Sequence, residues 1–357
     1  MSAKVPVSVV GVSWRSAPTH IRAQLAALTD ETDPVQELRR GGYVSGAVRV
    51  ATCSRTEWIL AADEAEWAAT LLQGALLNRV DGLAADQLHV RSGGASLHYL
   101  LRVAIGLDSV AEGEGAVGRQ VLKAFETARS RGLTDRRIRQ VWKQVERLIH
   151  ARRDLVPAAN SRGIQSLVRD LLREERVKDI AVLGRGEFGQ AMERLLRTTP
   201  DWKVSSYPRQ QMDDLFASKF DALVVCTGGN EPWLDLPKRH GAICVDAGSP
   251  PQVRGHEGWA LTGLDELLAR PDLHLADPER NALETMVMEA TQQLSQALSA
   301  HSQASTLAAI DAERTAFLNE HLPALLEGLP RDQVKKVRQA VGAFTHAILQ
   351  KTREVSS

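Results

Sequence analysis

A strand that runs directly into a glycine-rich turn and then a helix constrains the fold of this chain more than any other feature. The apolar run Asp179–Leu183 is followed by Gly184-Arg185-Gly186-Glu187-Phe188-Gly189 and a helical pattern. Further strand-like runs cover residues 203–206, 221–227 and Ala242–Asp246, and the last two are continuously apolar. Continuous apolar strands separated by helices are typical of a parallel sheet covered on both faces. We therefore predict a doubly wound α/β domain over residues 156–275.

The glycine-rich turn has the spacing of a dinucleotide-binding loop. Gly184 permits the tight turn, Gly186 lets the backbone approach a pyrophosphate, and Gly189 allows close packing of helix on strand. The start of the helix adds amide donors and a positive dipole end. We therefore expect Arg185, Glu187 and Phe188 to line the cofactor together with the three glycines. The alternative is an ordinary turn in which the glycines serve packing alone.

The end of the second strand of this domain indicates which dinucleotide binds. A site for NAD usually has an acidic residue there, which binds the ribose 2′-hydroxyl. This chain has Ser206 and Arg209 at that position and no carboxylate before Asp213. Hydroxyl and guanidinium groups suit a 2′-phosphate, so we predict NADPH as the cofactor.

The regions on either side of this domain have different patterns. Residues 1–155 alternate strand-like runs with helical ones, which predicts an α+β domain. The strand-like runs are 5–12, 47–51 and 59–61, and the helical ones are 21–28, 64–77, 96–108 and 118–130. Residues 276–357 are helical almost throughout, with interruptions at Pro323 and Pro330. A long helix followed by a helical hairpin suits a homodimerisation module, and the alternative is a subdomain packed on its own chain.

Composition excludes several classes of protein. The 357 residues carry no net charge, so any contact with nucleic acid must depend on a local patch. Three cysteines are too few for a disulfide framework, which favours a reducing cytoplasm. The chain has no apolar stretch of about 20 residues, no signal-peptide pattern, and no HxxxH or CxxC spacing. We therefore expect a cytoplasmic protein without a membrane span or a metal site.

Cys53 is the candidate nucleophile. It follows an apolar run and lies among hydroxyl and charged residues, in Thr52-Cys53-Ser54-Arg55-Thr56-Glu57. Arg55 would favour the thiolate, which is the form that attacks carbonyl groups. Cys226 and Cys244 lie inside apolar strands and show the commoner alternative, a buried and inert thiol. A thiolate together with a nicotinamide site predicts reduction of an acyl thioester to an aldehyde.

Three further segments extend this pattern into a family resemblance. The chain resembles the glutamyl-tRNA reductases in the segment from Gly11 through Ser16-Ala17-Pro18 to Arg22 and in the motif around Cys53. It also resembles them in the run Arg102-Val103-Ala104-Ile105-Gly106-Leu107-Asp108-Ser109, followed by Gly113-Glu114 and Gln120. The glycine loop and the helical tail occur in the family's order, so the resemblance covers nearly the whole chain.

The resemblance implies an activity and the residues that carry it out. Cys53 would attack the ester carbonyl of glutamyl-tRNA, and NADPH would reduce the thioester to glutamate-1-semialdehyde, the first step of tetrapyrrole (heme) synthesis. The implied partners are the aminoacyl-tRNA, a second copy of the chain and a downstream aminomutase. The residues implied to hold the aminoacyl group are Thr52, Ser54, Arg55, Ser109, Glu114 and Gln120. A guanidinium fork such as that of Arg55 can pair with the substrate carboxylate, and the alternative is an ion pair with Glu57 at the surface.

Departures from the family pattern concentrate in the substrate site. Ser54 replaces an asparagine, and Gly115-Ala116 replace a Pro-Gln pair. Tyr99 replaces a histidine, which leaves the adjacent His98 as the candidate catalytic histidine although it is rotated about 100° along the helix. Because polar contacts decide substrate selectivity, a paralogue that reduces another aminoacyl-tRNA or a carrier-bound thioester is an alternative. A non-catalytic regulatory homologue is a third.

The arginine-rich segment 129–153 is the candidate surface for RNA. It contains many arginines and few acids. One face of such a helix can meet a phosphate backbone, although a solvated helix face is the commoner meaning of a charge run.

Overall fold

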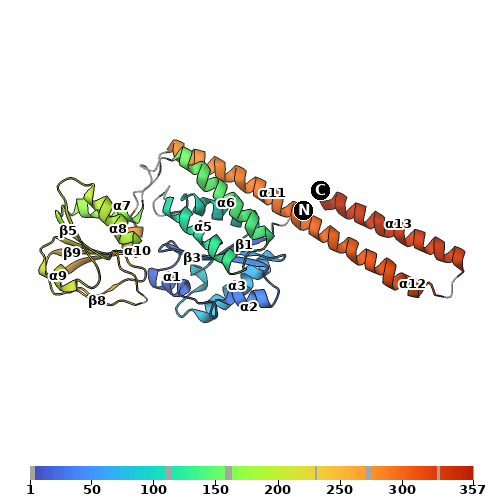
Figure 1. Cartoon of the computed structure of the whole chain (residues 1–357), viewed down its shortest axis with the longest axis horizontal. Coiled ribbons are helices and arrows are strands. Elements are labelled where there is room, and N and C mark those ends of the chain that lie inside the picture. The colour runs from blue at the N-terminus through green and yellow to red at the C-terminus, as the bar shows by residue number, and fades with distance from the viewer. Residues whose placement is uncertain are drawn as a thin grey trace.

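The computed structural model describes residues 5–109, 112, 115–156, 163–229, 231–270, 275, 277–327 and 330–356. Figure 1 shows three parts in a row. A part with a parallel sheet lies at one end, a part with a four-stranded sheet lies in the middle, and long helices project from the other end.

The middle part contains an antiparallel sheet in the order β2-β3-β1-β4. Its strands are β1 (Val7–Ser13), β2 (Gly46–Ala51), β3 (Arg55–Ala61) and β4 (His89–Ser92). Its helices are α1 (Thr19–Ala26), α2 (Pro34–Arg40), α3 (Ala65–Arg79), α4 (Gly94–Ala104), α5 (Gly115–Ser130) and α6 (Arg136–Leu155), with a short 3₁₀ turn η1 (Ala85–Gln87). The register pairs Ser13 of β1 with Arg55 of β3, which brings the β1–α1 loop beside the β2–β3 turn.

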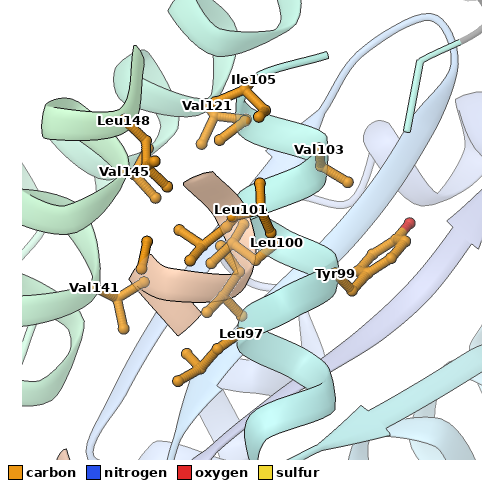
Figure 2. Packing of buried hydrophobic residues seen from close by; sticks show 14 of the residues in the cluster. Leu97, Tyr99, Leu100, Leu101, Val103, Ile105, Val121, Val141, Val145 and Leu148 are labelled. Carbon is orange, nitrogen blue, oxygen red and sulfur yellow. The ribbon is translucent and has the colours of Figure 1, made fainter. Parts of the chain in front are cut away.

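Helices cover both faces of this sheet. Every residue of β1 and β3 is buried, and alternate side chains enter two separate apolar clusters. Val9 and Ile59 pack with α4, α5 and α6, whereas Val10 and Leu60 pack with α1, α2 and α3. Figure 2 shows the first cluster, in which Leu97 and Leu101 of α4 face the valines of α6. The core of the middle part thus extends through the sheet on both sides.

The second part is a five-stranded parallel sheet in the order β11-β9-β7-β5-β6. Its strands are β5 (Asp179–Leu183), β6 (Lys203–Tyr207), β7 (Ala222–Val225), β9 (Ala242–Asp246) and β11 (Trp259–Gly263). A small parallel pair is formed by β8 (Leu234–Asp235) and β10 (Val253–Gly255). The helices are α7 (Ile164–Glu174), α8 (Glu187–Arg197), α9 (Met212–Ala217) and α10 (Leu264–Leu268). The three central strands β5, β7 and β9 carry buried apolar residues on both faces, which is why each face supports its own cluster.

The third part is helical. It consists of α11 (Asp277–Ala316), a π-helical turn η3 (Phe317–His321), α12 (Leu322–Leu325) and α13 (Arg331–Ser356). Leu283, Val287, Leu294 and Leu298 of α11 are buried in the cluster shared with α4 and α6. The rest of α11 extends beyond the middle part, and α13 returns along it (Figure 1). α11 is therefore both a core helix of the middle part and the base of the tail.

The expected fold class is confirmed in all three parts. The parallel sheet with helices on both faces is Rossmann-like, the amino-terminal part is α+β, and the carboxy-terminal part is helical. Two details differ from the sequence-based expectation. The edge strand β4 was not predicted, and the helical patterns within residues 290–322 belong to α11 and the π-helical turn that continues it.

Two absences hold for the described part of the chain. No helix there is long and apolar enough to cross a membrane. No group of three or more His, Cys, Asp or Glu side chains among those residues is arranged to hold a metal ion.

Candidate active site

Cys53 lies at the tip of the tight β2–β3 hairpin. The amide of Thr52 donates to the carbonyl of Arg55 at 2.8 Å, which closes the turn. The hydroxyl oxygen of Thr52 accepts hydrogen bonds from the amides of Ser54 and Arg55, both at 3.2 Å. These bonds fix the backbone on either side of Cys53. Thr52 and Ser54 therefore have a structural role that holds the thiol in one position.

The Cys53 side chain packs against the parallel-sheet part of the molecule. It is half-buried and contacts the apolar cluster of α7, β5, β7 and α10. Trp14 from the β1–α1 loop and Phe188 from the glycine loop pack against the same cluster. Cys53 thus lies at the interface between the two sheets and not on an open surface. The glycine loop contributes to the same apolar cluster.

Arg55 is fully buried and is held by three residues. Its Nη1 atom donates to a Glu57 carboxylate oxygen at 3.1 Å and to the Tyr99 hydroxyl at 2.8 Å. Its Nη2 atom donates to the Asp108 carbonyl and lies 3.5 Å from the Asp108 carboxylate. Burial opposes the charge on Arg55, but Glu57, Tyr99 and Asp108 together outweigh it and raise the pKa of the guanidinium. The ion pair with Glu57 exists as the alternative interpretation supposed, but it is buried and not at the surface.

Tyr99 and His89 complete the surroundings of Glu57. The Tyr99 hydroxyl donates to the Glu57 carboxylate, and His89 Nε2 lies 3.3 Å from the same oxygen. Burial opposes the charge on Glu57, but Arg55 and His89 hold its pKa below the usual range. Burial and the Glu57 charge raise the pKa of Tyr99. Figure 2 shows Tyr99 on the side of α4 that faces away from α6.

The histidine in this network is therefore His89, which the sequence did not indicate. Its ring also meets Tyr99 edge-on, with centroids 5.2 Å apart. His98 is next to Tyr99 on α4 and partly exposed, and within the described residues no hydrogen bond or ion pair joins it to this network. In the sequence, His89 begins a strand of only four residues, which is too short to show the alternating pattern of a strand. His98 as a catalytic residue stays a prediction.

Two buried polar atoms near Arg55 have no protein partner among the described residues. They are Arg55 Nε and the hydroxyl of Ser109, whose residue is 3% exposed. Ser109 directly follows Asp108, which also accepts from Arg15 at 2.7 Å. Buried polar groups almost always have a hydrogen-bond partner, so two such atoms without one indicate a bound ligand or an ordered water. Both residues are ones the sequence assigned to the substrate.

Gln120 lies on α5 and lines a groove of about 380 Å³ between α5 and the edge strand β2. Ala51, immediately before Thr52, lines the same groove, together with Arg49 and Lys123. The groove therefore reaches the base of the Cys53 hairpin. Glu114, the remaining substrate residue expected from the sequence, lies outside the described residues.

The glycine loop has the geometry that its spacing predicted. Gly184 has a φ of +115°, and a Cβ there would lie 2.7 Å from the Cys226 carbonyl. A Cβ on Gly189 would lie 2.1 Å from the Gly184 carbonyl, whereas one on Gly186 would meet nothing within 4 Å. Helix α8 begins at Glu187, with Gly186 as its N-cap. Space and amide donors thus occur together at the start of α8.

The ends of the neighbouring strands supply further polar groups. The hydroxyls of Ser206 and Thr227 are buried and have no protein partner among the described residues. Arg185 donates to the Ser206 carbonyl at 3.2 Å, and the guanidinium of Arg209 stacks on Trp233 at 3.9 Å. Unpaired hydroxyls and two guanidinium groups beside an open glycine loop fit a phosphorylated dinucleotide. Thr227 was not among the residues expected from the sequence.

Cys226 and Cys244 differ from Cys53 in their surroundings. Both lie in the parallel-sheet part, and burial together with Asp246 raises the pKa of the Cys226 thiol to about 12. The same two causes raise the pKa of Cys244. Neither thiol is suited to nucleophilic attack at neutral pH, because only the thiolate reacts.

Comparisons with known proteins find similarity to glutamyl-tRNA reductases. The sequence model described as the N-terminal domain of glutamyl-tRNA(Glu) reductase matches residues 10–151. A glutamyl-tRNA reductase from Thermomicrobium roseum is 28% identical over 392 aligned residues, which cover 94% of this chain and 91% of the relative. The chain is therefore similar in sequence to a glutamyl-tRNA reductase over almost its whole length. A glutamyl-tRNA reductase from Stenotrophomonas maltophilia strain R551-3 is 32% identical over 208 residues, or 55% of this chain.

Coverage of the family's members varies. The chain spans about half the length of some curated glutamyl-tRNA reductases that it matches, 46% for one from Moorella thermoacetica and 45% for the S. maltophilia relative. The solved glutamyl-tRNA reductase from Methanopyrus kandleri shares 19% identity and a TM-score of 0.52, and the match covers 99% of this chain and 97% of that one. The fold of this reductase therefore extends over all three parts of the present chain.

Proposed function

We propose that this chain reduces the acyl group of glutamyl-tRNA to glutamate-1-semialdehyde with NADPH, through a thioester on Cys53. The observation that carries the proposal is the position of Cys53. The thiol lies on a rigid hairpin and packs against the same apolar cluster as Phe188 of the glycine loop. A nucleophile and a dinucleotide loop at one interface suit acyl reduction.

The chemistry follows from a thiolate at this position. The Cys53 Sγ atom attacks the ester carbonyl carbon, the C–S bond forms, and the C–O bond to the ribose breaks as that oxygen takes up a proton. NADPH, when bound, supplies a hydride to the carbonyl carbon of the thioester. The Sγ atom then leaves with the electrons of the C–S bond, which frees the aldehyde. The Thr52 and Ser54 bonds of the hairpin hold the sulfur in place during both steps.

The unpaired atoms beside the hairpin are assigned to the substrate. Arg55 Nε and the Ser109 hydroxyl would bind the aminoacyl group, and Gln120 would contact it from the groove that ends at Ala51. Glu114 and His98 are retained in their predicted roles as substrate ligand and catalytic residue. In the cofactor site, the glycine loop with Arg185, Glu187 and Phe188 would hold the pyrophosphate. Ser206 and Arg209 would hold the 2′-phosphate of NADPH.

One observation favours a second candidate function. Both terminal nitrogens of Arg55 already face protein acceptors, Glu57, Tyr99 and Asp108. A substrate carboxylate would have to displace Asp108 to gain the paired hydrogen bonds of the guanidinium fork. An acyl group without that carboxylate would not. Reduction of another aminoacyl-tRNA or of a carrier-bound thioester is therefore the second candidate, with the same nucleophile and cofactor.

The decisive experiment measures NADPH-dependent aldehyde formation from glutamyl-tRNA, other aminoacyl-tRNAs and acyl-carrier thioesters. We expect aldehyde from glutamyl-tRNA, and none from the Cys53→Ser variant. The Cys244→Ala variant is the matched control, because it removes a thiol that lies inside a strand. Aldehyde from a different acyl donor alone would establish the second candidate. No aldehyde from any donor, with NADPH still bound, would overturn both and leave a non-catalytic regulatory protein.

The proposal extends to partners and cellular place. The described side chains of the tail include exposed large apolar residues, among them Phe317, Leu325 and Phe344, which support a homodimer formed through α11 to α13. The exposed arginines of α6 support contact with the tRNA. An aldehyde product is reactive, so a downstream aminomutase that takes it over is the expected partner in tetrapyrrole synthesis. The small number of cysteines supports a reducing cytoplasm as the location of the protein.

A further inference from the structure

Helix α1 in the middle part is capped by a residue from the parallel-sheet part. The residue before the helix is Pro18, which makes no side-chain cap. The Asp265 carboxylate of α10 instead accepts the Thr19 amide at 2.8 Å and the Thr19 hydroxyl at 2.5 Å. A carboxylate at this position satisfies an otherwise unpaired amide and interacts favourably with the helix dipole. Figure 1 shows α1 on the side of the middle part that faces α10.

Arg22, one turn further along α1, connects Asp265 to the backbone of the nucleophile. Its Nη2 atom lies 3.0 Å from the Asp265 carboxylate, and its Nε atom donates to the Cys53 carbonyl at 3.1 Å. Its Nη1 atom donates to the Ala17 carbonyl at 2.7 Å. The Arg22 side chain is out of contact with solvent. One guanidinium therefore ties together the Cys53 turn, the start of α1 and the opposite sheet.

The ion pair between Arg22 and Asp265 differs from a surface ion pair because the charged Arg22 side chain is buried. Burial lowers the pKa of Arg22, and Asp265 and Cys53 act in the opposite direction. Asp265 is the acid that forms an ion pair with Arg22 among the described residues. If the two sheets separated, Arg22 would lose this counterion, and loss of one partner from an ion pair whose other partner is buried is unfavourable. Helix α1 would lose its cap in the same movement.

We propose that Asp265 is a closure latch, a positioning residue that holds the parallel-sheet part against the Cys53 hairpin through Thr19 and Arg22. This inference rests on the proposed function, in which the thioester on Cys53 must meet a hydride donor held by the glycine loop. In the latched state the apolar cluster of the parallel-sheet part covers the thiol. The latch therefore keeps water from a thioester while the hydride donor is brought to it.

The test measures how fast Cys53 of the full chain is alkylated in the absence of substrate. Each variant is treated with iodoacetamide and with a bulky maleimide, and the labelled cysteine is located by peptide mass spectrometry. We expect Asp265→Ala to raise the maleimide rate at Cys53 about tenfold. In this variant Arg22 lacks the Asp265 counterion in the closed state as well as in the open state, so opening no longer breaks an ion pair. Cys226 and Cys244 should remain as slow as in the native chain, which shows that the parallel sheet stays folded.

Matched variants separate opening from a change in charge. Asp214→Asn removes one acid from α9, which lies at the end of the parallel-sheet part away from the middle part (Figure 1). It should leave both rates unchanged. Asp265→Asn removes the charge but keeps an acceptor for the Thr19 amide, so it serves if Asp265→Ala does not fold. An opened interface accelerates the bulky reagent more than the small one. Equal acceleration of both, or no acceleration, would overturn the latch.

A second measurement links the latch to turnover. If glutamyl-tRNA is a substrate, the Asp265 variants should release a larger share of the acyl group as free glutamate and a smaller share as aldehyde, because water reaches the thioester. An unchanged partition, with normal turnover, would overturn the latch. If no acyl donor is turned over, the proposed function fails by that result alone, and the labelling rates still decide whether Asp265 closes the interface.

Discussion

The Nη1 atom of Arg55 lies 3.1 Å from a carboxylate oxygen of Glu57, and the two side chains are 0% and 3% exposed. A buried ion pair adds little to stability in comparison with apolar side chains of the same size, because both charges lose their hydration. It does fix geometry, since neither partner can leave without stranding the other. In this chain the pair fixes the guanidinium of Arg55, whose Nε atom has no hydrogen-bond partner among the described residues.

Removal of the Glu57 charge should destabilise the chain strongly. We expect Glu57→Gln to lower the free energy of unfolding by about 3 kcal/mol, since it leaves a buried guanidinium with a weakened partner. Urea unfolding measures the change. The matched control is Glu37→Gln, which removes the same charge from the exposed pair with Arg79 and should cost less than about 1 kcal/mol. Equal costs in the two variants would contradict the importance of burial.

The sequence predicted those features that depend on local pattern. The Gly184, Gly186 and Gly189 spacing predicted a tight turn before a helix, because each glycine answers a steric requirement that is local to the loop. The continuous apolar runs predicted the parallel sheet for a similar reason. The position of Cys53 at a strand end also followed from its neighbours along the chain.

The sequence could not predict features that depend on distant contacts. The Arg55 network joins residues from β3, β4, α4 and the segment after it, and no periodicity places His89 beside Glu57. The short strand β4 is defined by its pairing with β1 and not by its own four residues. The Asp265 contact with Thr19 spans 246 positions, so only the folded chain reveals it. Charged residues in contact through space carry no signal in a single sequence.

The Tyr99 hydroxyl should give stability a specific alkaline pH dependence. Tyr99→Phe removes hydrogen bonds to two charged groups and should cost about 2 kcal/mol at pH 8. The folded-state pKa of Tyr99 is raised above its ordinary value of 10.0, so the unfolded chain releases this proton first. The contribution of Tyr99 is therefore complete below pH 10 and declines as the pH rises above it. Urea unfolding of both proteins at pH 8 and pH 11 measures the difference.

The difference between the two proteins isolates Tyr99, because the other titrating groups are common to both. The gap in free energy of unfolding between the native chain and Tyr99→Phe should be constant from about pH 6 to 9 and smaller at pH 11. A gap that widens with pH would show that Tyr99 ionises more readily in the folded chain, against the burial observed here.

Two glycine variants should separate cofactor binding from folding. Gly186→Ala places its methyl group in open space, so the thermal unfolding midpoint should stay close to that of the native chain. NADPH affinity should fall at least tenfold, because the methyl group occupies the path of the pyrophosphate. Gly189→Ala places a carbon 2.1 Å from the Gly184 carbonyl and should lower the midpoint as well. Normal NADPH binding by a folded Gly186→Ala protein would remove the glycine loop from the cofactor site.

The exposed arginines of α6 should contribute to the salt dependence of tRNA binding. Arg136 and Arg139 are exposed, whereas Arg137 pairs with Asp63 at 2.6 Å. We expect the double variant Arg136→Gln with Arg139→Gln to weaken tRNA binding and to reduce the slope of log K against log salt by about 1 to 2. Arg137→Gln should change the slope less, since its charge is already paired. Filter binding between low and moderate salt measures the slopes, and an unchanged slope in the double variant would exclude this surface.

The helical tail should associate through its apolar side chains. Phe344 is 67% exposed on α13, and Leu325 is 68% exposed at the end of α12. Large apolar side chains gathered on an exposed helical hairpin usually mark an interface, because water contact with them is unfavourable. We expect Phe344→Glu to convert a dimer to a monomer in analytical ultracentrifugation, with helical content unchanged. The control Gln339→Glu adds the same charge to α13 without removing apolar surface and should remain dimeric. A native chain that sediments as a monomer at micromolar concentration would show instead that the tail is a subdomain packed on its own chain.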